Sequence, residues 1–538
     1  MSFFKPFGDA AGASSNGKCA CYMVKLMKYK KWAIFATIMT VLMLICEAYA
    51  VVMLNLLNMV PTKLFITGVV FLIFFTVITV LFYFLGITKK QKGKKKHLMN
   101  IRRFIAVLLT VCMMVGSVYI AFVSSKVRKT VQKVTNTEDV IVAMMGVYVL
   151  SEDPAKSIDD VKDYTFAVMS DYDTGNTEYA VKHLEEKFGK VLTKTSGATI
   201  TDAAGLLYGR EAGALIVNQA YAQVLPDTTE FRDFESFTRL LYEIPVTVKS
   251  DVSPTPVVVD NVPADEVNAT PTPEPGRTVT NDPFVLYISG SDTRSKLLDK
   301  ARSDVNILMI VNPKTKQILL LNTPRDYYVA NTAGGGKMDK LTHCGIYGID
   351  CSMSTLSNLY GVSVDYYAQI NFTGFKTLVD EIGGIEVESP ANFKAGSYTY
   401  VKGMNEMDGE KALAFARERY AFGSGDNERG KNQMRVIKAV INKMTSNNSV
   451  VLKNFSGILD SLSGMFVTSL SADDINSLVK MQLDDKAKWE VFSFAVTGNG
   501  GMDYTYSMPR VKAYVMYQNE TLVKQASGLV DKVMNGEK

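Results

Sequence analysis

The sequence predicts an α/β protein with an N-terminal three-helix transmembrane region, a small α/β accessory domain, and an α/β/α layered domain with a central mixed sheet. Three observations support this prediction. Residues up to about 125 contain three long apolar runs flanked by lysine clusters. The remainder has the composition of soluble protein, with helical and strand-like patterns in alternation. A proline-rich segment divides that remainder, and 538 residues are too many for one core.

Each of the three apolar runs is long enough to cross a bilayer, which needs about 20 apolar residues. We place the membrane spans at about 32–53, 64–87 and 104–123. Glu47 is an exceptional charge within these runs, and we expect it to face the other helices or the outer interface. No small-residue cleavage site follows the first run, so we interpret it as an anchor and not as a signal peptide.

Lysine and arginine residues set the expected orientation, because positively charged loops stay in the cytoplasm. They gather before the first span and between the second and third, whereas only Lys63 lies between the first and second. Residues 1–126 are therefore predicted to comprise a cytoplasmic N-terminus and three spans, with everything after about Val123 outside. These clusters explain much of the net charge of +5. Because no helix-turn-helix pattern is evident either, we expect no nucleic-acid partner.

The sequence of residues 127–250 predicts a small α/β domain. Val140–Val149 alternates like a strand, Tyr179–Phe188 is helical, and Ala203–Leu207 and Ala212–Val217 resemble a helix and a strand around a turn. Catalytic side chains do not cluster in this stretch, so an accessory or spacer role is the favoured interpretation. Residues 251–282 are rich in proline and predict a semi-extended linker.

Residues 283–538 form the layered domain. Strands are predicted at Phe284–Ser289, Val305–Val311, Gln317–Asn322, Tyr366–Asn371 and Ile385–Glu388. Helices are predicted at Met353–Leu359, Phe375–Ile382, from an Asp408 N-cap to Arg417, and at Arg429–Met444, with further helix and strand over Trp489–Val496 and Lys512–Val533.

Arginine placement in this domain points to phosphate chemistry. Arg417 and Arg419 are two residues apart and cannot share a helix face, so we expect them where a helix ends. Guanidinium groups bind phosphate in a bidentate manner, and isolated carboxylates such as Asp292 and Asp304 suit a hard cation. For any single arginine an ordinary surface ion pair is the better interpretation. For the whole set that interpretation is weaker.

Several motifs carry a resemblance to a known family. They are Gly290-Ser291-Asp292-Thr293-Arg294, Ala301-Arg302-Ser303-Asp304, Asn322-Thr323-Pro324-Arg325-Asp326 and the run from Gly409 to Arg419, completed by Asp426, Arg429 and Gln433. Residues from 283 to about 535 resemble the LytR–CpsA–Psr domain. With three membrane spans and an accessory domain, the arrangement is similar to that of CpsA-type members.

The resemblance implies a multi-pass enzyme of the bacterial cell membrane whose catalytic domain lies outside the cell. It implies transfer of a glycan phosphate from a polyprenyl-pyrophosphate carrier to peptidoglycan. The donor would be a capsular polysaccharide or teichoic acid precursor. The expected partners are this lipid-linked glycan, the peptidoglycan acceptor and membrane lipid.

The resemblance also assigns site residues. Asp292 and Asp304 would hold Mg²⁺, with Mn²⁺ as an alternative. Pyrophosphate contacts would come from Arg302, Arg325, Lys340, Arg417, Arg419, Arg429 and Gln433. Catalysis would rest on Arg302, Arg325, Arg417, Arg419 and Asp426, with Asp426 or Asp304 as the proton acceptor. An apolar lipid tunnel would draw on Leu356, Tyr366, Ile370, Phe372, Phe375 and Leu378, each of which also fits a simple core position.

The chain departs from the family pattern in two places. Lys340-Leu341-Thr342-His343-Cys344 stands where the family often has Lys-x-Asn-x-Ala, and Asn432 precedes Gln433 where the family favours arginine. We interpret His343 as a polar loop residue and not as a base. Cys344 and Cys351 either form a disulfide or remain free thiols.

Two rival functions remain open at this stage. The same arginine cluster could belong to a lipid-binding scaffold that performs no chemistry, or to a hydrolase that only cleaves pyrophosphate. Product formation with an acceptor glycan, compared with phosphate release without it, separates these functions from transfer.

Overall fold

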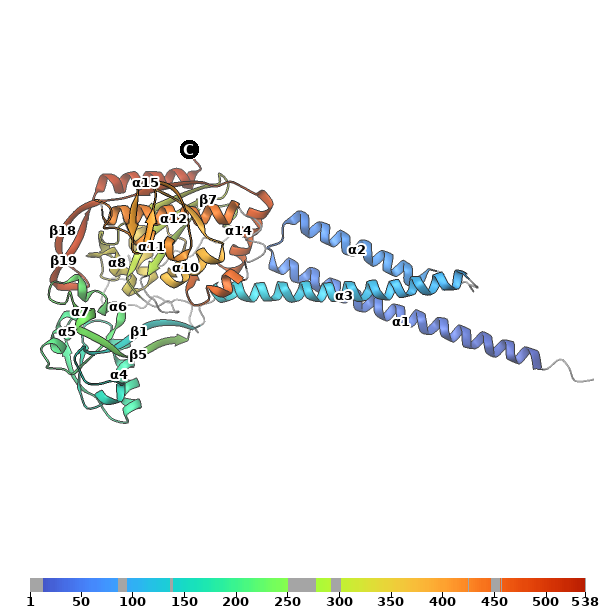
Figure 1. Ribbon diagram of the computed structural model, residues 1–538, viewed down its shortest axis with the longest axis horizontal. Helices are drawn as coiled ribbons and strands as arrows, with labels where there is room; N and C mark the ends of the chain where they lie inside the picture. The colour runs from blue at the N-terminus through green and yellow to red at the C-terminus, as the bar shows by residue number, and fades with distance from the viewer. Residues whose placement is uncertain are drawn as a thin grey trace, which may run out of the picture. The chain divides into compact units, whose positions relative to one another are not determined.

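The computed structural model describes residues 13–85, 94–135, 139–249, 277–291, 301–423, 425–446, 455 and 457–537 (Figure 1). The chain divides into two compact units, Met1–Lys129 and Thr130–Lys538. The predicted linker over 251–282 lies mostly outside the described residues, as does Asp292.

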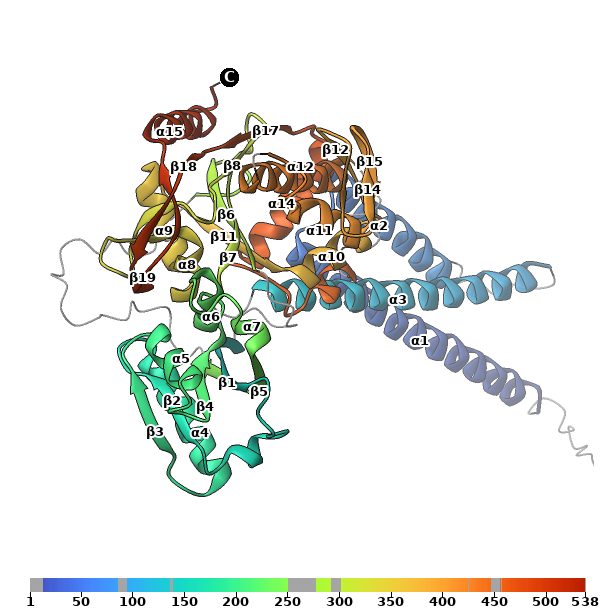
Figure 2. The same ribbon diagram turned by 60° about the vertical axis from the view of Figure 1, so that its left-hand side comes forward.

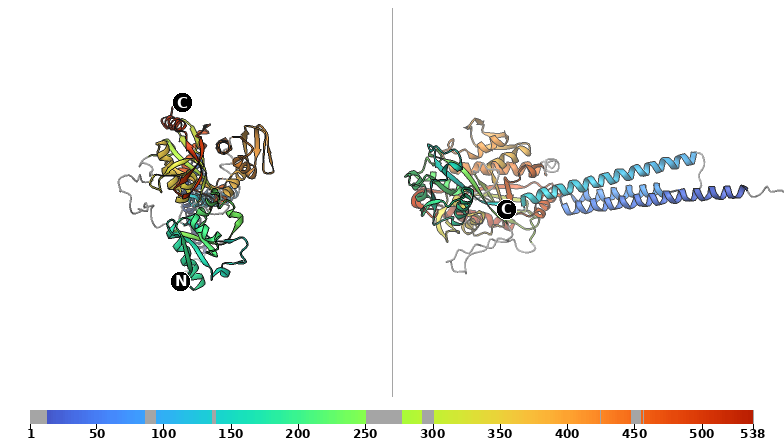
Figure 3. Two further views of the ribbon diagram at one scale, coloured as in Figure 1. Left: turned by 90° about the vertical axis from the view of Figure 1, so that its left-hand side faces the viewer. Right: turned by 90° about the horizontal axis from the view of Figure 1, so that it is seen from below.

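The N-terminal unit consists of long helices that run alongside one another (Figure 3). They are α1 (Ala13–Leu57), α2 (Thr62–Phe84) and α3 (Lys94–Thr135). Their segments Lys31–Leu57, Thr62–Phe84 and His97–Thr135 are long and apolar enough to cross a membrane, which agrees with the three predicted spans. Glu47 accepts hydrogen bonds from the Thr76 hydroxyl at 2.8 and 3.0 Å, so it faces a neighbouring helix.

The accessory region is an α/β domain around a five-stranded sheet with the strand order β3-β2-β4-β1-β5. Strand β1 pairs in antiparallel fashion with β4 and β5, while β2 pairs in parallel with β3 and β4. The predicted strands and helices over 140–217 correspond to these elements, although β4 begins at Ala214, two residues after the start of the predicted strand. Their bounds are β1 (Asp139–Leu150), η1 (Ile158–Val161), β2 (Thr165–Met169), α4 (Thr174–Phe188), β3 (Thr193–Gly197), α5 (Ile200–Tyr208), β4 (Ala214–Asn218), α6 (Gln219–Ala222), η2 (Leu225–Asp227), α7 (Phe234–Phe237) and β5 (Thr238–Lys249).

The larger domain is built on a six-stranded mixed sheet with the order β16-β11-β6-β7-β8-β17, as predicted. Pairs β11/β6 and β8/β17 are parallel, and β6/β7, β7/β8 and β11/β16 are antiparallel. The strand bounds are β6 (Phe284–Ser291), β7 (Ser303–Asn312), β8 (Gln317–Asn322), β11 (Tyr366–Asn371), β16 (Phe466–Thr468) and β17 (Glu490–Ala495). Every residue of β8 is buried, because both faces of a central strand are covered.

Alternate residues of these strands pack on opposite sides, which produces the predicted α/β/α layers (Figure 2). On one side, apolar residues of β6 to β8 pack against α9 (Ile349–Tyr360) and α15 (Glu520–Asn535). On the other side, they pack against α12 (Asp426–Ser446) and α14 (Ala472–Asp485).

Smaller elements surround this sandwich. Helices α10 (Phe372–Glu381) and α11 (Gly409–Arg417) pack with two hairpins, β12 (Ile385–Ser389) with β15 (Gly403–Met407) and β13 (Phe393–Ala395) with β14 (Tyr398–Tyr400). The others are β9 (Tyr328–Asn331), β10 (Lys337–Lys340), α8 (Leu341–Cys344), η3 (Gly345–Tyr347), β18 (Gly498–Thr505) and β19 (Met508–Gln518).

The accessory domain and the layered domain share one apolar cluster. Ile346, Met508 and Ala513 of the layered domain are buried together with accessory residues such as Leu225 and Phe231. Pairs of tyrosine rings also cross the boundary, Tyr221 with Tyr347 at 6.3 Å and Tyr172 with Tyr506 at 6.0 Å between centroids. Apolar burial of this kind is the main force that holds packed domains together.

Candidate active site

The site begins where two central strands meet the same edge of the sheet. Strand β8 ends at Asn322 and leads into Arg325, while the antiparallel β7 begins at Ser303, next to Asp304. Arg325 donates from Nη1 to Asp304 Oδ1 at 2.9 Å, and its Nε lies 3.6 Å from Asp326 Oδ2. The predicted position of Arg325 directly after a strand is therefore correct, and sheet topology brings Asp304 to it.

Burial alone would raise the pKa of Asp304. The guanidinium groups of Arg325, Arg302 and Arg429 outweigh burial, so the pKa of this carboxyl lies below its ordinary value. Asp304 and Asp326 in turn raise the pKa of Arg325 above its usual range, against the effect of burial. The paired groups therefore stay ionised at neutral pH.

Helix α12 brings a second arginine to this edge. Gly430 packs directly on Asn322, the last residue of β8, since a Cβ at Gly430 would lie 2.3 Å from Asn322 Nδ2. This close approach places Arg429 near Asp304 and Arg325. Gln433 lies one turn further along α12 and is buried, as the i, i+4 spacing predicts.

Asp426 forms an ion pair with Arg429 in the first turn of α12, with Oδ1 and Nη2 2.7 Å apart. Burial raises the pKa of Asp426 above its ordinary value, although Arg429 works in the opposite direction. Burial lowers the pKa of Arg429. A buried carboxyl with a raised pKa is suited to accept a proton near neutral pH.

Arg417 and Arg419 stand at a helix end, as their spacing predicts. Asp408 caps α11 by accepting from Lys411 N, and Arg417 is the last helical residue because Glu418 is extended, with φ −68° and ψ 131°. The Arg417 guanidinium lies over the Phe372 ring at 4.5 Å. Arg419 donates to the Tyr420 hydroxyl at 2.9 Å and contributes to the electrostatic environment of Asp426.

Lys340 enters the cluster from the end of β10. Its side chain is only 2% exposed, and its Nζ lies 3.2 Å from Asp326 Oδ1. Helix α8 follows at once, and η3 after it comes close to the residues just before β7, since a Cβ at Gly345 would lie 2.4 Å from Ala301 O. Lys340 and Arg325 nevertheless lie near each other, because both pair with Asp326.

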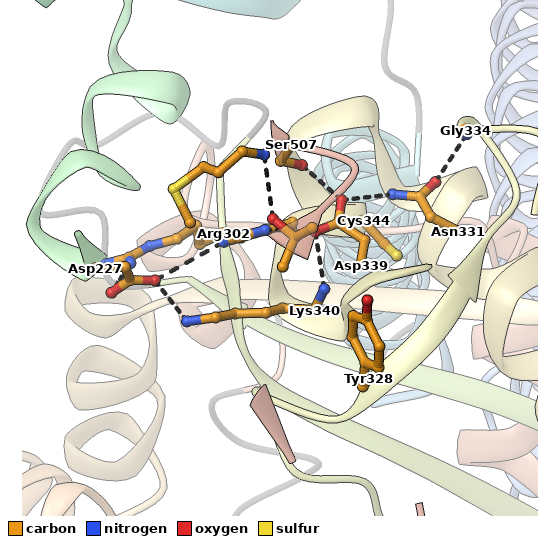
Figure 4. A network of polar contacts seen from close by, with 12 residues as sticks. Asp227, Arg302, Tyr328, Asn331, Gly334, Asp339, Lys340, Cys344 and Ser507 are labelled. Carbon is orange, nitrogen blue, oxygen red and sulfur yellow. Dashed lines mark hydrogen bonds and ion pairs between the residues drawn. The ribbon is translucent and has the colours of Figure 1, made fainter. Parts of the chain in front are cut away.

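The interpretation of His343 as a polar loop residue is wrong. His343 is fully buried in α8, and its Nδ1 lies 2.7 Å from Asp339 Oδ1. Burial would lower the pKa of His343, but Asp339 and Asp227 raise it overall. Asp339 also accepts from the Ser507 hydroxyl at 2.6 Å (Figure 4). This hydrogen bond fixes the carboxylate that orients the His343 imidazole.

The accessory domain contributes Asp227, which sequence reasoning missed. Asp227 Oδ2 lies 2.9 Å from Lys340 Nζ, and Oδ1 lies 3.4 Å from Arg302 Nη1 (Figure 4). Burial would raise the pKa of Asp227, but His343, Lys340 and Arg302 hold it well below its usual range. The segment Leu225-Pro226-Asp227 resembles an ordinary turn, so no local pattern distinguishes this carboxylate.

Only one of the two predicted magnesium ligands lies among the described residues. Asp304 offers a carboxylate oxygen of the kind that Mg²⁺ prefers, whereas Asp292 lies outside the described residues. No group of three or more His, Cys, Asp or Glu side chains with metal-binding geometry occurs in the part of the chain that the structure describes. The chemistry of Asp304 fits a magnesium ligand, and the ion itself stays a prediction.

The residues considered for a lipid tunnel do not share one surface. Leu356 lies in the core beneath α9 and α15, whereas Tyr366 lies in the core on the opposite face of the sheet. Phe375 and Leu378 pack against a third cluster, between α10 and the hairpins. The six residues are therefore not one lining.

Cys344 and Cys351 are both buried free thiols. Cys344 Sγ donates to Thr355 Oγ1 at 3.7 Å, and Cys351 Sγ donates to Asn331 Oδ1 at 3.2 Å.

Comparison with known proteins identifies the family of this chain. Residues 257–524 match the LytR_cpsA_psr family model. The chain is 36% identical over 233 residues to the polyisoprenyl-teichoic acid–peptidoglycan teichoic acid transferase TagU of Enterococcus faecalis, covering 43% of this chain and 75% of that protein. It is also 36% identical over 196 residues to TagU of Bacillus licheniformis, covering 36% of this chain and 62% of the relative.

Two solved structures also resemble part of the chain. Bacillus subtilis TagT has 28% sequence identity and a TM-score of 0.38, with 48% of this chain and 94% of that chain covered. TagT bound to LI-WTA has 28% identity and the same TM-score, with coverages of 47% and 91%. Because the Enterococcus relative is 36% identical and is covered over 75% of its length, the chain belongs to the LytR–CpsA–Psr family.

Proposed function

We propose that this protein is a membrane-anchored phosphotransferase that attaches a polyprenyl-pyrophosphate-linked glycopolymer to peptidoglycan. The observation that carries the proposal is the convergence of Arg302, Arg325, Lys340 and Arg429 with four carboxylates at one sheet edge. The names of the TagU relatives favour a teichoic acid as the polymer. A capsular polysaccharide precursor is the alternative donor. The lysine distribution supports an extracytoplasmic location for the catalytic domain.

The charged groups suit a pyrophosphate substrate. Arginine and lysine side chains that are already oriented by carboxylates neutralise the negative charge of the two phosphates and of the leaving group, without reorganisation during the reaction. Lys340 and Arg325 are both held by Asp326, which fixes the direction of each donor. We assign Arg302, Arg325, Lys340, Arg417, Arg419, Arg429 and Gln433 to the lipid-linked pyrophosphate.

The transfer step exchanges one phosphorus–oxygen bond for another. A sugar hydroxyl of peptidoglycan attacks the phosphorus nearer the glycan, and the bond from that phosphorus to the bridging oxygen breaks. Polyprenyl phosphate leaves with the bond electrons, and the hydroxyl proton passes to Asp426. Asp426 suits this role better than Asp304 because the pKa of Asp426 is raised and that of Asp304 is lowered.

We propose that Asp292 and Asp304 hold Mg²⁺, with Mn²⁺ as the alternative. The ion would supply positive charge beside the phosphate oxygens. Asp304 already pairs with Arg325 through Oδ1, so its carboxylate position is fixed independently of the ion. Removal of Mg²⁺ with a chelator should therefore abolish transfer and leave the thermal unfolding midpoint nearly unchanged.

The proposal is tested with the full-length protein in detergent micelles. A synthetic polyprenyl-pyrophosphate glycan, peptidoglycan oligomers and Mg²⁺ are supplied, and products are identified by mass spectrometry. We expect a glycan–phosphate–peptidoglycan adduct that disappears in Asp292→Ala and Arg325→Ala. Release of glycan phosphate and polyprenyl phosphate without any adduct would support a hydrolase, and tight lipid binding without products would support a scaffold.

A further inference from the structure

Asp227 reaches the cationic cluster from a domain that lies outside the family match. The match begins at residue 257, whereas Asp227 belongs to η2 of the accessory domain. Its carboxylate nevertheless pairs with Lys340 at 2.9 Å and with Arg302 at 3.4 Å (Figure 4). The accessory domain therefore supplies an anionic group to a site that the layered domain otherwise builds.

Local packing fixes the position of Asp227. Leu225 at the start of η2 is fully buried in the apolar cluster that both domains share. The Thr228 hydroxyl donates to Leu225 O at 2.8 Å and accepts from Phe231 N at 3.2 Å, which closes a compact turn around Asp227. The carboxylate is thus presented by a rigid segment and not by a mobile loop tip.

The charges of the site form an alternating chain across the domain boundary. Arg302 pairs with Asp227, Asp227 with Lys340, and Lys340 with Asp326. Asp326 then pairs with Arg325, and Arg325 with Asp304. Lys340 is nearly inaccessible to water, so its ammonium group depends on these two carboxylates for partners. Removing one link leaves a buried cation partly unpaired, which is costly in a low-dielectric environment.

We infer that Asp227 is a positioning residue through which the accessory domain completes the pyrophosphate-binding site, holding Lys340 and Arg302 in the geometry that receives the substrate. This inference rests on the proposed function. It changes the expected role of the accessory domain from a spacer to a structural component of the site. The alternative is that the Asp227 carboxylate occupies the place of a substrate phosphate. In that case, removing the carboxylate would make anion binding tighter.

The test compares Asp227→Asn with a matched interface variant in the full-length protein. Arg510→Gln removes another ion pair between the same two domains, Arg510 with Asp202 at 2.5 Å, without touching the cationic cluster. Titration calorimetry with inorganic pyrophosphate gives Kd, and steady-state transfer gives KM and kcat. We expect Asp227→Asn to raise Kd and the donor KM about tenfold, with a smaller effect on kcat. Arg510→Gln should leave all three near wild type.

Conservative and alternative substitutions complete the design. Asp227→Glu keeps the charge and should recover part of the lost affinity. Asp227→Ser serves as a second neutral variant, and thermal unfolding identifies any variant that fails to fold. An unchanged or lower Kd in a folded neutral variant would overturn the inference, as would equal weakening by Arg510→Gln. Wild-type protein that neither binds pyrophosphate nor transfers glycan would contradict the proposed function instead.

Discussion

At the scale of single residues, burial and pairing separate the roles of chemically similar groups. Asp304 and Asp426 are both aspartates near Arg429, yet the pKa of Asp304 is lowered and that of Asp426 is raised. Asp304 faces three guanidinium groups, whereas burial dominates at Asp426. One carboxylate is therefore suited to hold charge and the other to exchange a proton.

Asp426→Asn should lower kcat for transfer by about 100-fold or more, because a general base contributes roughly two to four orders of magnitude. In the wild type the base works only when deprotonated, so activity should rise with pH through a pKa above the ordinary 3.8 of an aspartate. The residual activity of Asp426→Asn should lack this acidic limb. The pH dependence of kcat/KM measures both effects, and an acidic limb that persists would exclude Asp426 as the base.

At the scale of elements, close backbone contacts set where the arginines stand. Helix α11 begins at Gly409, where a Cβ would lie only 2.3 Å from Lys376 O of helix α10. Because this contact involves backbone, neither helix can yield by rotating a side chain. The contact fixes the position of α11 and hence of Arg417 and Arg419 at its other end.

Gly409→Ala should therefore destabilise the protein by about 1–3 kcal/mol, the usual cost of forcing extra volume into a packed contact. Transfer activity should also fall, because α11 must shift. Gly528→Ala is the matched control, since Gly528 lies in helix α15 with open space around its Cβ position. That substitution should be neutral or stabilise by about 0.5–1 kcal/mol. The thermal unfolding midpoints of both variants test this prediction. Equal midpoints for Gly409→Ala and Gly528→Ala would contradict the packing argument.

At the scale of the whole molecule, the distribution of lysine predicts how the chain is threaded through the membrane. Three apolar helices with basic segments before the first and before the third predict that the C-terminal domain lies outside the cell. This orientation is a requirement of the proposed function, because peptidoglycan lies outside the membrane.

Reporter fusions test this orientation in growing bacteria. Alkaline phosphatase fused after Lys538 should be active, and the same enzyme fused after Lys90 should be inactive. Green fluorescent protein at the same positions should give the reverse pattern. Active phosphatase at Lys90 together with an inactive C-terminal fusion would show the inverted topology. In that topology the membrane would separate the site from the peptidoglycan acceptor, which would contradict the proposed function.

Much of the fold was predictable because its determinants are local. Strand β8 and strand β11 occupy the predicted residues, since a run of apolar side chains between turn residues has few alternatives. Arg417 stands at a helix end because two arginines at i and i+2 cannot share a helix face. Family motifs pointed to Arg325, Lys340 and Arg429, and the structure brings these residues together.

The sequence by itself determined the three apolar helices and the order of most strands and helices, and it predicted the set of arginines that we propose for the site. Only the tertiary structure decided that His343 is buried and that Asp227 joins Lys340 across 113 residues of chain. The physical reason is that periodicity reports whether a side chain faces inward, but not which distant surface it meets. The meeting of Asp227 with Lys340 depends on an apolar interface between two domains, and that interface leaves no mark on the residues around Asp227.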